Sequence, residues 1–186
     1  MFKDSTLSIY NVHWKIRIIR ENFIDFYGAI IPTVFSLFIL FYMVYFRKFP
    51  FRNYVSHFLL SIAFGFMTSR ASPNAVVTFY KLFALLVSSL VVFITFYDGG
   101  LLKFLTSRDF HRLDFTKRNY FNALLIAYSY ASLSILIVDL AYLPFAITFY
   151  IGAMGLTDGI ILSGLITPLC VTFATLFVLF LHEMRA

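Results

Sequence analysis

The chain has 186 residues, of which 61% are hydrophobic and only 13% are charged, and its mean hydropathy is +0.86. A soluble domain of this length has too little interior to bury so much apolar surface, so the composition excludes an ordinary soluble globular protein and indicates an integral membrane protein. The net charge of +6 comes from Lys and Arg between apolar runs, which is typical of membrane proteins and does not indicate nucleic-acid binding. The single cysteine, Cys170, excludes an intrachain disulfide and a cysteine-rich metal site.

Apolar runs follow one another along most of the chain. Spanning a bilayer takes about 20 apolar residues, and somewhat fewer in a thin membrane. The predicted spans are residues 26–46, 54–68, 75–97, 120–143 and 150–181. A charged segment precedes the first run, so we expect that run to act as an uncleaved signal anchor. The sequence therefore predicts an all-α, polytopic transmembrane helical bundle that forms a single membrane domain over residues 1–186.

The last run is too long for one simple span. Pro168 lies inside it, so the run is predicted to be one helix kinked at this proline or two short helices broken there. The first alternative gives five spans, which we take as the prediction, and the second gives six. A turn is expected at residues 69–74, between the second and third runs, and Pro144 is expected to end the fourth.

Basic residues indicate the orientation in the membrane. Residues 98–119 form the longest polar connection, either an interfacial helix or a loop. With five spans, the side of the membrane that holds this connection carries nine Lys and Arg residues, against five on the other side. The nine are Arg47, Lys48, Arg52, Lys103, Arg108, Arg112, Lys117, Arg118 and Arg185. Because cytosolic loops carry the excess of Lys and Arg, this side is predicted to be cytosolic.

Polar residues recur along one face of the fourth run. They are spaced by seven, three and seven residues, which places them within about one quadrant of a helix at 100° per residue. The four residues of this polar stripe are Asn122, Ser129, Ser132 and Asp139. A carboxylate in hydrocarbon costs about 2.5–3.5 kcal/mol, so Asp139 is expected to face protein or water. The stripe is interpreted either as hydrogen bonding between helices or as the wall of a polar cavity for a lipid head group.

Three further polar residues lie in or beside the apolar runs. Asp158 lies within Gly155-Leu-Thr-Asp-Gly159, whose small-residue spacing favours close helix packing, and it is expected in the same interface. Two acids near one membrane face could share a proton, bind a cation or orient a hydroxyl substrate. Lys81 is interpreted as reaching the membrane surface or as pairing with one of the acids. His57 is either an interfacial residue or an acid–base group. No metal-binding motif accompanies them.

One stretch of the chain resembles a block of the glycosylphosphatidylinositol (GPI) inositol acyltransferase (PIG-W) family, in a divergent and much shortened form. In that block, a span ends in a Val-Asp pair, a proline follows after four residues, and a Phe-Ala-x-Thr element and an Asp-Gly start of the next span come after it. The matching residues here are Val138, Asp139, Pro144, Phe145, Ala146, Thr148, Leu156, Asp158 and Gly159. Ile147 and Phe149 stand where the family has Lys and Glu.

The resemblance implies a polytopic enzyme of the endoplasmic reticulum that moves an acyl group from acyl-CoA to the inositol of glucosaminyl-phosphatidylinositol in GPI-anchor biosynthesis. Acyl-CoA would be a co-substrate, and no bound cofactor is expected. Asp139 and Asp158 would be the catalytic acids, one of them holding or deprotonating the inositol hydroxyl. The expected substrate-binding residues are Asn122, Ser132, Thr148, Lys81 and His57.

Two other functions fit the same residues. In the first, the chain is a non-enzymatic polytopic membrane subunit or receptor-like bundle, associated with partner membrane subunits, whose acids and glycines only pack helices. In the second, it is a small carrier that uses Asp139, Asp158 and Lys81 as a path for protons or ions.

Overall fold

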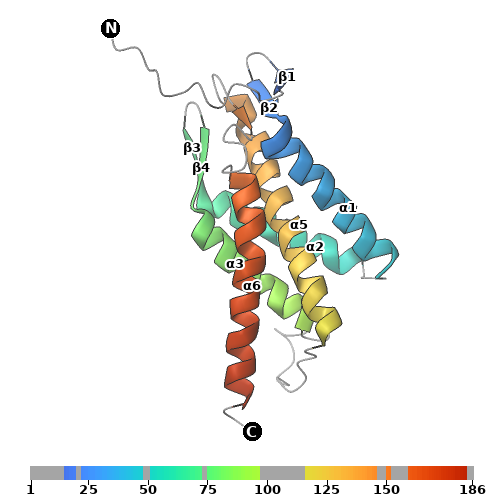
Figure 1. The fold of residues 1–186 in the computed structure, drawn as a ribbon. Coiled ribbons are helices and arrows are strands. Elements are labelled where there is room, and N and C mark those ends of the chain that lie inside the picture. The colour runs from blue at the N-terminus through green and yellow to red at the C-terminus, as the bar shows by residue number, and fades with distance from the viewer. Residues whose placement is uncertain are drawn as a thin grey trace.

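A bundle of α-helices makes up most of the protein (Figure 1). The computed structural model describes residues 15–19, 22–47, 51–72, 75–96, 116–145, 150–151 and 159–183. The α-helices in these ranges are α1 (Ile31–Tyr45), α2 (Phe51–Thr68), α3 (Tyr80–Phe96), α5 (Lys117–Tyr142) and α6 (Gly159–Glu183). A π-helical turn, Phe26–Ile30, leads into α1, and a 3-10 turn, Leu143–Phe145, extends α5. The prediction of a mostly helical protein is confirmed.

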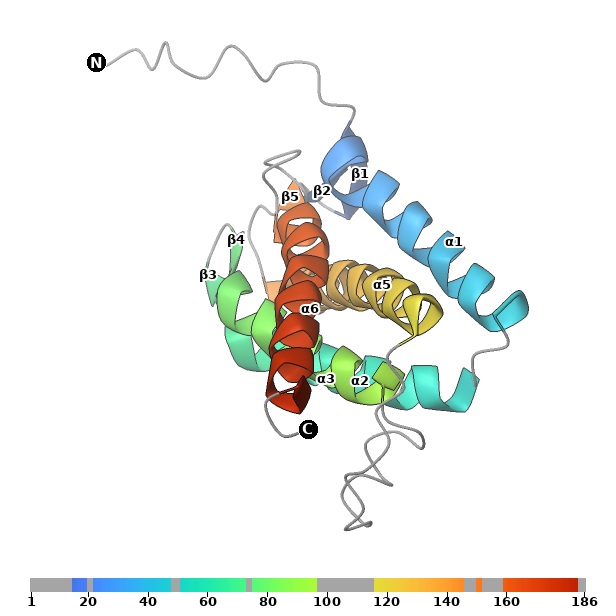
Figure 2. The same cartoon turned by 60° about the horizontal axis from the view of Figure 1, so that its bottom comes forward.

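Helix α5 occupies the centre of the bundle, with α1, α2, α3 and α6 packed around it (Figure 2). It begins after Thr116, whose side chain accepts a 3.2 Å hydrogen bond from the Asn119 amide, as an N-cap does. Small side chains then recur at every fourth position, at Ala123, Ala127 and Ala131, and all three are fully buried. Such a small-residue face lets neighbouring helices approach closely.

Two glycines of other helices pack closely against α5. A Cβ atom on Gly65 of α2 would lie 2.9 Å from Val138 Cγ2, and one on Gly164 of α6 would overlap Ser132 Oγ. The tight contacts therefore involve Gly65 and Gly164. The small-residue face predicted around Gly155 and Gly159 lies largely outside the described residues, and only Gly159 is described there, as the first residue of α6.

Large apolar side chains cover the outward faces of α1 and α6. Each of the following is more than half exposed: Val34, Phe35, Phe38, Phe41, Leu165, Leu169, Phe173 and Phe177. Three helical segments of the described chain are long and apolar enough to cross a membrane, namely Phe26–Tyr45, Lys117–Phe145 and Ile160–Phe177. Two shorter apolar helices, Tyr54–Thr68 and Tyr80–Phe96, accompany them. The outward faces thus suit a lipid environment.

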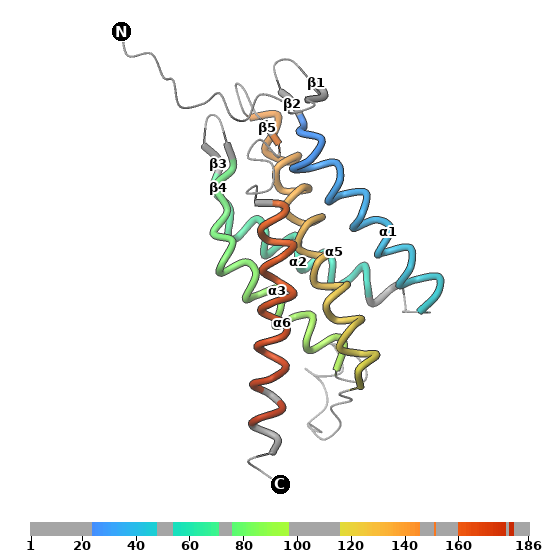
Figure 3. The backbone as a smooth tube through the Cα atoms, viewed as in Figure 1, coloured from blue at the N-terminus to red at the C-terminus, as the bar shows by residue number. Residues whose placement is uncertain are grey.

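The helices alternate in direction, so the end of one helix and the start of another meet at each end of the bundle. The end of α1, with Arg47, and the start of α5, with Lys117 and Arg118, lie at the same end of the bundle, together with the last turns of α6 (Figure 1). We call this the basic end. Figure 3 traces α5 and α6 side by side, with the start of α5 near the later turns of α6.

Two small sheets accompany the helices in the described residues and correct the predicted starts of two spans. Strand β3 (Ser69–Ser72) pairs antiparallel with β4 (Ala75–Thr78), so the third helix begins at Tyr80 and not at residue 75. Residues 76–78 are Val-Val-Thr, and β-branched side chains favour strands. The hairpin is fastened to α2 by a 2.8 Å hydrogen bond from the Phe79 amide to the Thr68 carbonyl.

The second sheet joins distant parts of the chain. Strand β2 (Asn22–Asp25) lies between β1 (Lys15–Ile19), to which it is antiparallel, and β5 (Tyr150–Ile151), to which it is parallel. The last predicted span, 150–181, therefore starts with a strand, and its helix begins only at Gly159. That helix continues through Pro168, where one alternative placed a break. Proline is tolerated inside membrane helices because neighbouring groups satisfy the freed carbonyl. The number of membrane crossings stays a prediction.

Candidate functional site

The middle of the polar stripe on α5 forms a buried network with α1 and α2. The Tyr54 hydroxyl lies 2.6 Å from Ser129 Oγ, and Ser129 Oγ donates a 3.3 Å hydrogen bond to the Ser36 carbonyl of α1. The Tyr130 hydroxyl donates to the Tyr54 carbonyl at 2.9 Å, and the two tyrosine rings meet edge to face at 4.7 Å. All four residues are buried. The network therefore ties three helices together.

Two further serines of α5 bond to other helices. Ser134 Oγ donates a 2.9 Å hydrogen bond to Ser61 Oγ of α2, and Ser132 Oγ donates a 3.4 Å hydrogen bond to the Ile160 carbonyl of α6. Interhelical hydrogen bonds of this kind contribute about 0.6 kcal/mol on average in membranes, and up to about 1.7 kcal/mol. Ser129 and Ser132 of the stripe thus contact different neighbours, which matches the first interpretation of the stripe, hydrogen bonding between helices.

The ends of the stripe are Asn122 and Asp139, and both are buried. Asn122 lies near the basic end, and its Oδ1 atom has no hydrogen-bond partner among the described residues. Asp139 lies near the opposite end of α5, and its side chain is only 8% exposed. The carboxylate therefore lies within the protein, as expected from the cost of placing a charge in lipid.

The other predicted site residues lie on other elements. His57 is buried on α2, with its Nδ1 atom 3.2 Å from Ser56 Oγ. Lys81 is exposed on the first turn of α3, which is the position that suits an ammonium reaching the membrane surface. Asp158 and Thr148 lie outside the described residues. Within the described residues, no group of three or more His, Cys, Asp and Glu side chains could hold a metal ion.

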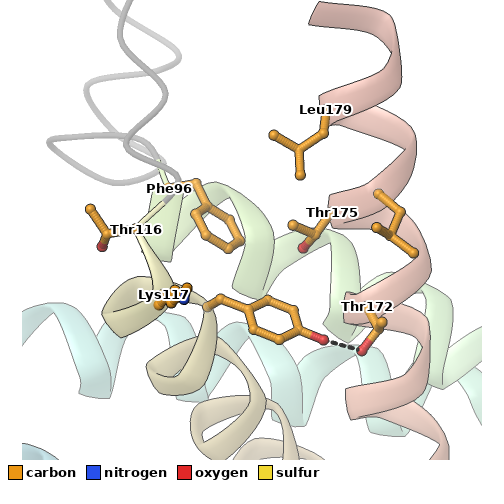
Figure 4. A pocket seen from close by; sticks show the side chains of 8 residues that line it. Phe96, Thr116, Lys117, Thr172, Thr175 and Leu179 are labelled. Atoms are coloured by element: carbon orange, nitrogen blue, oxygen red, sulfur yellow. Dashed lines mark hydrogen bonds between the residues drawn. The ribbon is translucent and has the colours of Figure 1, made fainter. Parts of the chain in front are cut away.

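A cavity of about 340 Å³ lies at the basic end, where α3, α5 and α6 meet (Figure 4). Its walls are formed by Phe96, Thr116, Lys117, Tyr120, Thr172, Thr175, Leu176 and Leu179. A 2.8 Å hydrogen bond between the Tyr120 hydroxyl and Thr172 Oγ1 crosses from α5 to α6 at the cavity wall. Of the predicted catalytic and substrate-binding residues that the structure describes, none lines this cavity.

The sequence does hold a signal for one wall of the cavity. Thr172, Thr175, Leu176 and Leu179 are spaced as i, i+3, i+4 and i+7, which places them on one face of a helix. The rest of the wall comes from the end of α3 and the start of α5. The end of α3, the start of α5 and the face of α6 lie far apart in the sequence, so no local sequence pattern indicates that they form one cavity.

The fold and the contacts define a class of protein, a mostly helical chain with three helices apolar enough to cross a membrane and a hydrogen-bonded central helix. No protein-family model, curated protein or solved structure matches the chain.

Proposed function

We propose that the chain is an integral membrane protein whose helices cross the bilayer as a bundle around α5, with the basic end in the cytosol. The apolar outward faces of α1 and α6 support the membrane location, since water would leave these aromatic and aliphatic side chains poorly solvated. The orientation follows the sequence count of nine Lys and Arg residues on the side of residues 98–119, against five on the other side. Arg47 fits the membrane surface, because its guanidinium lies 5.4 Å from the centre of the Tyr42 ring and its Nε donates to the Tyr42 hydroxyl.

Within the membrane, we propose a non-enzymatic role as a structural subunit of a larger membrane assembly. One observation carries this proposal: the serine hydroxyls of the polar stripe are used in hydrogen bonds between helices. Ser129 bonds to α1 and α2, and Ser132 bonds to α6. These hydrogen bonds between helices account for the serines of the polar stripe without a bound substrate.

The test replaces both acids of the predicted site and follows assembly. Asp139→Asn combined with Asp158→Asn is expected to leave expression, membrane extraction and the size of the detergent-solubilised assembly unchanged. Wild-type protein should also show no acyl-CoA-dependent labelling of inositol phospholipids. Labelling that depends on either acid would contradict the non-enzymatic role. Release of the wild-type chain by alkaline washing would instead contradict the membrane location itself.

Acyl transfer to the inositol of glucosaminyl-phosphatidylinositol is a second candidate function, located in the endoplasmic reticulum. It is favoured by the burial of Asp139 in the segment that resembles the acyltransferase block. A carboxylate held there could bind or deprotonate an inositol hydroxyl as it attacks the acyl-CoA thioester. Complementation of a host that lacks its own inositol acyltransferase tests this function. Activity of the wild-type chain that is lost in Asp139→Asn would support it, and a membrane-inserted but silent wild type would exclude it for the isolated chain.

A further inference from the structure

We propose that the cavity at the basic end binds one acyl chain of an anionic phospholipid from the cytosolic leaflet, with the lipid phosphate beside Lys117. This site is separate from the polar stripe. The inference rests on the proposed membrane location and orientation, but not on either candidate activity.

The walls of the cavity suit hydrocarbon. Phe96, Leu176 and Leu179 contribute apolar surface. The hydroxyl groups beside them are already used: Thr172 Oγ1 donates to the Pro168 carbonyl at 3.0 Å, and Thr175 Oγ1 donates to the Val171 carbonyl at 2.8 Å. A cavity whose hydroxyl groups are already bonded within the protein offers little to water away from Lys117. Its volume of about 340 Å³ falls within the range of roughly 300–1,000 Å³ that is usual for small-molecule sites.

The cavity also opens toward the bilayer. Leu176 lines it and yet is 57% exposed on the outward side of α6, whereas Phe96 at the end of α3 is fully buried. The cavity therefore extends from the surface that faces lipid to the interior of the bundle. An acyl chain could enter sideways from the leaflet without passing through water.

The charges at the rim select an anionic head group. Lys117 and Arg118 occupy the first turn of α5, both are exposed, and this turn holds no acidic residue. The N-terminal end of a helix carries a partial positive charge, which repels the side-chain cations of Lys117 and Arg118. An anion bound there offsets this repulsion and so stabilises the start of α5. The cytosolic leaflet supplies anionic lipids. A free phosphate would leave the hydrocarbon-lined volume empty, and a zwitterionic lipid would offset the rim charge less well.

Photo-crosslinking of the full chain in phosphatidylcholine vesicles tests the site. The probes are phosphatidic acid and phosphatidylcholine, each with a photoactivatable group in one acyl chain. We expect the phosphatidic acid probe to label residues 172–179 of α6 about fivefold more than the phosphatidylcholine probe, since one basic residue near the surface contributes a factor of this size. Lys117→Gln should largely remove this preference. Arg70→Gln, which changes an exposed basic residue on β3, should retain it.

Filling the cavity gives a second, independent variant. Leu179→Trp should strongly reduce labelling of residues 172–179, whereas Leu165→Trp, on the outward face of α6 and away from the cavity, should not. Labelling spread evenly over the outward faces of α1 and α6 and insensitive to these changes would overturn the proposal, because it would show only the surrounding bilayer lipid. Displacement of the probe by millimolar inorganic phosphate would also overturn it. Failure of the wild-type chain to insert into the vesicles would be seen separately, by alkaline extraction before illumination.

Discussion

Helices α5 and α6 are almost equal in length, at 26 and 25 residues, and both contain long apolar stretches, yet they occupy different environments. Of the most apolar part of α5, 72% is buried, against 39% for α6. The difference lies in where the hydroxyl groups go. Ser129, Ser132 and Ser134 of α5 bond to other helices, whereas Thr167 and Thr175 of α6 bond to carbonyls of their own helix, four residues back.

This contrast shows that a polar residue in an apolar helix does not by itself mark an interface. A hydroxyl that bonds to a carbonyl of its own helix is satisfied without a neighbouring helix, so it can lie at the edge of the bundle without a free-energy penalty. The serine hydroxyls of the central helix, α5, instead bond to three neighbouring helices, α1, α2 and α6. If this distinction holds, the stability of the bundle depends more on the contacts of α5 than on the outward face of α6.

The largest effect is expected from Gly164→Leu, where α6 approaches α5. Its side chain would meet Ser132 and the Tyr128 ring, and forcing α6 outward should lower the free energy of unfolding by about 3 kcal/mol. Thermal unfolding in detergent measures this change. Ala63→Leu, at an exposed position on α2, is the matched control and should be nearly neutral. Equal stability of both variants would mean that α6 does not pack on α5 at Gly164.

A smaller effect is expected from the hydroxyl pair Tyr54 and Ser129. Tyr54→Phe and Ser129→Ala should each lower the free energy of unfolding by about 1 kcal/mol, with a coupling of about 0.6 kcal/mol in the double-mutant cycle. Thr167→Val on α6 removes only a bond within one helix and should cost less than about 0.5 kcal/mol. If Thr167→Val lowered the free energy of unfolding as much as Ser129→Ala, hydroxyl bonds within α6 would matter as much as those between α5 and its neighbours. That result would contradict the proposed difference between the two helices.

Asp139→Asn is expected to change the free energy of unfolding by less than about 1 kcal/mol. Asn keeps the shape and one acceptor of the side chain, and it removes the cost of a carboxylate in a poorly solvated place. Chemical denaturation in detergent micelles gives the value. Destabilisation by more than about 2 kcal/mol would show that the charge itself holds the bundle, and the polar stripe would then depend on more than its serines.

The smallest effect is expected on the outward face of α6. Leu169 is 58% exposed, and lipid chains are as apolar as leucine, so Leu169→Ala should change the free energy of unfolding by less than about 0.5 kcal/mol. Ile126→Ala, at a fully buried position on α5, should cost about 2–4 kcal/mol in the same measurement. A large cost at Leu169 would identify this face of α6 as the contact with a partner subunit.

Local sequence signals predicted the helices well but not their mutual contacts. The end of α2 at Thr68, the helical turn beginning at Phe26 and the end of α5 near Pro144 follow from apolar runs and helix breakers. Strand β4 was missed because Ala75, Val76 and Val77 are apolar and merge with the apolar run of α3. Conversely, the spacing of Ser129 and Ser132 indicated a shared face, and both side chains are indeed buried.

The contacts of the candidate sites depended on tertiary structure. Tyr54 and Ser129 lie 75 positions apart, and nothing in either segment indicates the other. The cavity is formed where the end of α3 meets α5 and α6, so its residues share no motif. Asn122 and Asp139 were predicted as members of the polar stripe, with Asn122 binding substrate and Asp139 acting as a catalytic acid. Whether they act on a substrate cannot be deduced from periodicity, which describes a face and not its partner.

The pairing of β2 with β5 has a consequence for biosynthesis. Phe23 and Ile24 are made before any of the helices, but their partners Tyr150 and Ile151 emerge only after α5 is complete. Closing so long a loop is slow, and β2 meanwhile presents an unpaired strand edge on its side opposite β1. Strand β5 therefore pairs with β2 only after the central helix α5 has been made.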